Sequence, residues 1–162
     1  MPVISQWATP WHGLEAVLNI WNVCLGIAVF FLARVLAILY FMNNIDDESI
    51  RSQSWNRLLP ESIAFLLFFL AFLAHWLIAD GFAVNPDTQE IFMQPYKYAL
   101  NLLEMPYVTG ILLVGVILVL WGIGKTYLNP SYREGIWFSG TGTVLTVLAL
   151  LLCAGWNHTA YY

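Results

Sequence analysis

Four long apolar stretches, at about 18–42, 62–82, 107–124 and 135–156, constrain the fold of this chain more than any other feature. A helix needs roughly 20 mainly apolar residues to cross a hydrocarbon core of about 30 Å. The stretches are also too continuously apolar for membrane β-strands, in which apolar and polar residues alternate. The sequence therefore predicts an all-α integral membrane protein, a four-helix bundle that forms a single transmembrane domain over residues 1–162.

The composition excludes several classes of protein. Apolar residues make up 60% of the chain and charged residues 10%, against about 45–50% and about 25% in soluble domains. The six basic and ten acidic side chains are too few to cover the surface of a soluble domain of 162 residues. A net charge of −4 provides no basic surface for phosphate backbones, so we expect no nucleic-acid partner.

The basic residues outside the spans predict the orientation. Arg51, Arg57, Lys125 and Arg133 lie in the first and third connections, whereas the termini and the second connection contain only Lys97. The positive-inside rule then places the first and third connections in the cytoplasm. Both termini and the outer loop 85–106 are expected on the non-cytoplasmic side.

The N-terminal segment 1–14 contains no Lys or Arg, so the sequence predicts no cleaved signal peptide. We expect either a bacterial inner membrane or an organelle membrane. In the outer loop, apolar residues recur at roughly helical spacing over Pro95–Glu104. This pattern predicts a short amphipathic helix in the outer interface; the alternative is an ordered loop packed on a partner subunit.

One arginine, Arg34, lies inside the first span, and Glu61 lies near the cytoplasmic end of the second. Ionisable residues in a span are costly and rare, so each one needs an explanation. We expect a structural ion pair between Arg34 and Glu61. The alternative is that Arg34 contributes to a site for an anion, a quinone or a lipid headgroup.

All three histidines fall on the predicted outer side, and imidazoles bind haem and metal ions. The candidate cofactor-binding residues are His75, His158 and Arg34, for a haem or a quinone. The candidate metal ligands are His12, His158 and Asp80, for copper or zinc. No recognised ligand spacing accompanies them, and a buried histidine bonded to a neighbouring helix explains His75 equally well.

Small residues predict where helices pack closely. Ala33 and Ala37 form a small-xxx-small pair in the first span, and Gly140, Gly142 and Thr146 lie in the fourth. Small side chains let helix backbones approach each other, and hydroxyl groups can bond across the contact. We therefore expect a tight contact along the cytoplasmic half of the fourth span.

The function that these features favour is that of a non-catalytic accessory or scaffolding subunit of a larger membrane complex, respiratory or photosynthetic for example. It would contact membrane lipids and other membrane subunits, or copies of itself in a homo-oligomer. The first alternative is a redox or metal-binding or haem-binding protein that uses the outer histidines. The second is a small membrane enzyme or a channel, although a transport pathway usually needs charged side chains or broken helices at mid-membrane.

Overall fold

The structure of this protein is a computed structural model, which describes residues 14–159. All four expected apolar helices are present, and each is long and apolar enough to cross a membrane. Two shorter helices and two strands complete the described part of the chain. In order, the elements are η1 (Leu14–Leu18), α1 (Ile20–Asn44), α2 (Glu48–Ile78), β1 (Gly81–Val84), β2 (Ile91–Gln94), α3 (Lys97–Glu104), α4 (Pro106–Leu128) and α5 (Gly135–Gly155).

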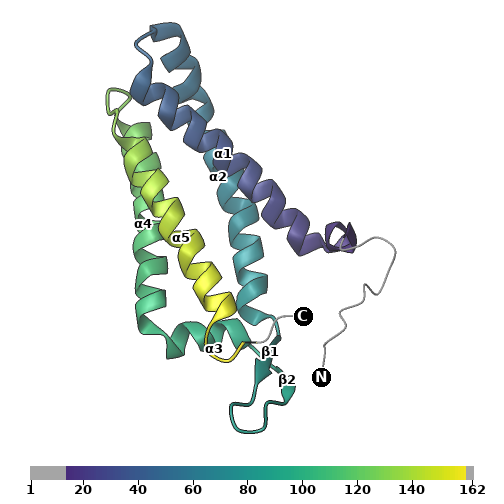
Figure 1. Cartoon of the computed structure of the whole chain (residues 1–162). Helices are drawn as coiled ribbons and strands as arrows, with labels where there is room; N and C mark the ends of the chain where they lie inside the picture. Colours follow the sequence, from purple (N-terminus) through teal and green to yellow (C-terminus); the bar gives the residue numbers. More distant parts are fainter. Residues whose placement is uncertain (1–13, 160–162) are drawn as a thin grey trace.

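The four long helices form two pairs, α1 with α2 and α4 with α5 (Figure 1). The short connections 45–47 and 129–134 lie together at one end of the molecule, which we call the connector end. The opposite end holds the β1–β2 hairpin and α3, and we call it the hairpin end. Towards that end α1 leans away from α4 and α5, so the two pairs pack far less closely with each other than within themselves.

Helix α2 begins much earlier than the sequence predicts. Its 31 residues correspond to about 46 Å at 1.5 Å per residue, which is more than a hydrocarbon core requires. The side chain of Asp47 caps its first turn by accepting a hydrogen bond from the Ile50 backbone N–H at 3.0 Å. The helix thus begins before the apolar stretch 62–82, and Pro60 lies inside it.

The described part of the chain is mostly helical, as expected, and it adds one two-stranded sheet at the hairpin end. β1 and β2 pair in antiparallel register, with Phe82 opposite Met93. The edge of β1 is also bonded to the segment that follows α5, since the Val84 N–H donates to the His158 carbonyl at 2.7 Å. Helix α3 lies next to this sheet, within the range where the apolar spacing predicts a helix.

Helices α4 and α5 meet along glycines that bring the two backbones together. A Cβ added to Gly142 would lie 2.5 Å from the Gly115 carbonyl oxygen, and one added to Gly115 would lie 2.6 Å from Thr146 Oγ1. The Ser139 hydroxyl donates across the contact to the Val119 carbonyl at 3.0 Å. We call this contact the α4–α5 seam, and its close approach depends on small residues.

Of the predicted packing residues, Gly142 and Thr146 lie in the α4–α5 seam. Gly140 does not, because a Cβ added there would meet no heavy atom within 4 Å. Ala33 and Ala37 are exposed on α1 and mark no tight contact. Instead, α1 turns larger side chains toward α2. The buried cluster of this pair includes Val35, Leu39, Met42, Leu58 and Phe65.

Candidate functional site

The predicted Arg34–Glu61 pair is formed between α1 and α2. Arg34 Nε donates to Glu61 Oε2 at 2.7 Å, and Nη2 donates to Oε1, so the contact is bidentate. The Glu61 side chain is 8% exposed, whereas the Arg34 side chain is 46% exposed. The Phe30 ring lies 5.7 Å from the guanidinium carbon. The pair neutralises a buried carboxylate and links the two helices, and it leaves half of the arginine open on the outer surface of the pair.

The two predicted histidines that the structure describes do not come together in one site. The His75 ring stacks on the Trp21 ring with centroids 4.0 Å apart and an angle of 8°, which joins α1 and α2 near the hairpin end. His158 is exposed, with a left-handed φ of 54°, and Asp80 is exposed as well. Within residues 14–159, no group of three His, Cys, Asp or Glu side chains is placed to hold a metal ion. His12, the third predicted ligand, lies outside the described residues.

A buried polar network at the hairpin end connects α3 to the segment after α5. Asn101 is completely buried, and its Nδ2 donates to the Cys153 carbonyl and to Thr159 Oγ1, both at 2.9 Å. Its Oδ1 accepts from Asn157 Nδ2 at 3.1 Å. Lys97 Nζ donates to the Asn157 carbonyl at 2.8 Å. We call these residues, with Glu104, whose carboxylate accepts from Asn157, the hairpin-end network.

The positive charge of the hairpin-end network, on Lys97, is buried. Lys97 is only 4% exposed. Burial lowers the pKa of the Lys97 ammonium, and the nearby Glu104 carboxylate opposes that shift. Because most of the donors and acceptors bond to backbone carbonyls or to one another, the network fixes chain geometry and offers few free groups to a substrate.

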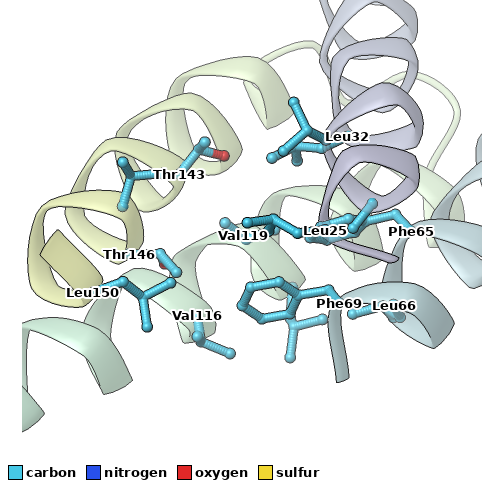
Figure 2. A pocket seen from close by; sticks show the side chains of 14 residues that line it. Leu25, Leu32, Phe65, Leu66, Phe69, Val116, Val119, Thr143, Thr146 and Leu150 are labelled. Atoms are coloured by element: carbon cyan, nitrogen blue, oxygen red, sulfur yellow. The ribbon is translucent and has the colours of Figure 1, made fainter. Parts of the chain in front are cut away.

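A cavity of about 90 Å³ lies between the four spanning helices (Figure 2). Side chains such as Phe69 and Val119 form its wall, and the described residues that line it carry no charge. Its two hydroxyl groups donate within their own helix, Thr143 to the Ser139 carbonyl and Thr146 to the Gly142 carbonyl, both at 2.8 Å. The cavity can therefore hold a small apolar group but supplies no acid, base or nucleophile.

Comparison with known proteins adds no identity to this picture, since no protein-family model, curated protein or solved structure matches the chain. The assignment of function therefore depends on the geometry above.

Sequence reasoning missed Asn101, a polar residue that is fully buried. It lies on the buried side of α3 and bonds to residues 52 and 56 positions away. A hint was present in the sequence, since Lys97 and Asn101 are four residues apart and share one face of the predicted amphipathic helix.

Proposed function

We propose that the protein is a non-catalytic accessory or scaffolding subunit of a larger membrane complex, of the kind found in respiratory or photosynthetic assemblies. The observation that carries this proposal is the small part of each spanning helix that the chain itself covers. In the most apolar windows, buried residues make up 22% in α1, 17% in α2, 33% in α4 and 28% in α5. Most of the surface of the two helix pairs is thus left to lipids or to other subunits.

Several buried polar groups form hydrogen bonds within the chain, which supports a structural role. Ser139 and Thr126 donate to helix carbonyls at 3.0 and 2.8 Å, and Asn101 fixes the segment after α5. Arg34 and Glu61 neutralise each other. A catalytic centre usually gathers titratable groups around a cavity, whereas the cavity between these four helices is apolar.

The proposed orientation places the connector end in the cytoplasm. Arg51, Arg57, Lys125 and Arg133 belong to that end, and Lys97 to the hairpin end. This distribution follows the positive-inside rule. The membrane would be a bacterial inner membrane or an organelle membrane.

The test is purification from native membranes in a mild detergent, with the mass of the particle, its optical spectrum and its metal content measured on one sample. Larger subunits that co-purify in fixed ratio, with no haem or metal bound to this chain, would support the proposal. A small oligomer of this chain alone that carries stoichiometric haem, copper or zinc would contradict it and favour the redox alternative.

Photocrosslinking locates the contact with a partner. A photoreactive residue at Leu67 of α2 or Ile117 of α4, which are 64% and 61% exposed, should capture a partner subunit from at least one of the two pairs. The matched control is Leu39, which is 1% exposed and should crosslink only within the chain. If neither exposed position captures a protein in native membranes, these two faces contact lipid, and the accessory role loses its main support.

A further inference from the structure

A groove of about 330 Å³ lies between α1 and the first turns of α2, near the connector end. Its volume is in the range of small-ligand sites. Its polar wall includes Arg34, Gln53 and Arg57, and its apolar wall includes Ala37, Phe41 and Ile50.

The charge of the groove is positive. Arg34 is paired with Glu61, but its side chain remains 46% exposed. Arg57 is exposed and makes no hydrogen bond or ion pair with any other described residue. It precedes Glu61 by four residues, one turn of α2, and its charge acts on that carboxylate without a direct contact. No carboxylate is among the described residues that line the groove.

The depth of the groove matches the boundary of a bilayer. Counting about 20 residues back from Ile78, the end of α2, puts the edge of the hydrocarbon core near residue 59. Arg57 and Gln53 then lie at the level of the lipid headgroups. Arg34 lies at the depth of its partner Glu61, just inside the core, and an arginine can extend toward the headgroups.

An arginine that is half exposed at this depth is costly unless an anion or water meets it. Phe30, one turn deeper on α1, is 58% exposed and provides an apolar surface beneath the guanidinium. A phospholipid satisfies both surfaces at once, because its phosphate can accept from the arginines while an acyl chain lies along α1. Basic pockets between spanning helices are known places for anionic headgroups.

We propose that the groove between Arg34 and Arg57 binds the phosphate of an anionic phospholipid from the leaflet at the connector end. Gln53 lies beside the phosphate, on the side away from the hydrocarbon core. The site does not depend on whether the protein is an accessory subunit.

The experiment is native mass spectrometry of the detergent-purified chain, titrated with phosphatidylglycerol, phosphatidylcholine or inorganic phosphate. The wild type should bind one phosphatidylglycerol more tightly than phosphatidylcholine. Arg57→Gln should weaken phosphatidylglycerol binding about fivefold, the effect of one basic residue near an anionic lipid surface. It should fold normally, because Arg57 is exposed and unpaired in the described part of the chain.

The matched control is Lys125→Gln, which removes one positive charge at the connector end but lies outside the groove. It should change the affinity by less than about twofold. Gln53→Glu adds a carboxylate to the groove and should weaken binding at least as much as Arg57→Gln does. Equal affinity for the two lipids, or equal losses in Arg57→Gln and Lys125→Gln, would overturn the proposal. Displacement of the lipid by millimolar inorganic phosphate would also overturn it, since the site would then belong to a free anion.

Discussion

The α4–α5 seam provides the sharpest test of the packing described above. In Gly142→Ala, the new methyl carbon would lie 2.5 Å from the Gly115 carbonyl oxygen and 2.7 Å from the Val119 backbone nitrogen. Both neighbours are backbone atoms of α4, so neither can move aside by changing a rotamer. The two helices must separate or shift along the seam.

The size of the effect follows from two opposing contributions. Overpacking a closely packed contact costs about 1–3 kcal/mol, and alanine gains up to about 1 kcal/mol over glycine in a helix interior. Because the clash is with backbone on two sides, we expect the free energy of unfolding to fall by about 2 kcal/mol. For a chain of this length, that loss lowers Tm by about 4–8 °C.

The assay is thermal unfolding in one detergent, followed by tryptophan fluorescence. The matched control is Gly140→Ala, two residues away on the same helix, where an added Cβ has no heavy atom within 4 Å. This control gains helix propensity without a clash, so its Tm should equal or exceed that of the wild type. If Gly142→Ala melts at or above the wild-type temperature, or if the two alanine variants melt together, the seam does not have the described geometry.

Three further predictions use the same unfolding assay. Arg34→Gln should lower Tm more than the double variant Arg34→Gln/Glu61→Gln does, because the single change leaves a buried carboxylate without its partner; equal losses would contradict this. Asn101→Leu should cost about 1–3 kcal/mol, because the buried Cys153 carbonyl loses its side-chain donor, and unchanged stability would show that the network contributes nothing. Since burial lowers the pKa of Lys97, the unfolded chain binds more protons just below the usual lysine pKa of about 10.4, and stability should rise with pH in that range; Lys97→Met should remove that rise.

The spanning helices could be predicted from the sequence because their evidence is local. An uncharged apolar run of about 20 residues has few other stable structures. The start of α2 could not be predicted in this way, because its first turns are polar and Pro60 resembles a helix start. In the structure, Asp47 is the cap, and the polar turns extend beyond the apolar part of the same helix.

The ion pair could be predicted because each of its two charges is conspicuous within its own apolar run. Arg34 and Glu61 stand out as charges in apolar runs, and each is the nearest partner of the other. The four-residue strands of the hairpin are too short to show alternation. The choice between Gly140 and Gly142 depends on which face of α5 meets α4, and no spacing within α5 alone decides that.

The central claim is that four helices cross a membrane with the connector end in the cytoplasm. The direct measurement is labelling of single introduced cysteines in intact cells with a membrane-impermeant thiol reagent. Ser131→Cys lies in the connection 129–134, and Thr88→Cys lies between β1 and β2; the parent chain, whose Cys24 and Cys153 lie within α1 and α5, is the control. The account predicts that Thr88→Cys is labelled and that Ser131→Cys is labelled only after the cells are opened. Labelling of Ser131→Cys in intact cells, with Thr88→Cys protected, would contradict it.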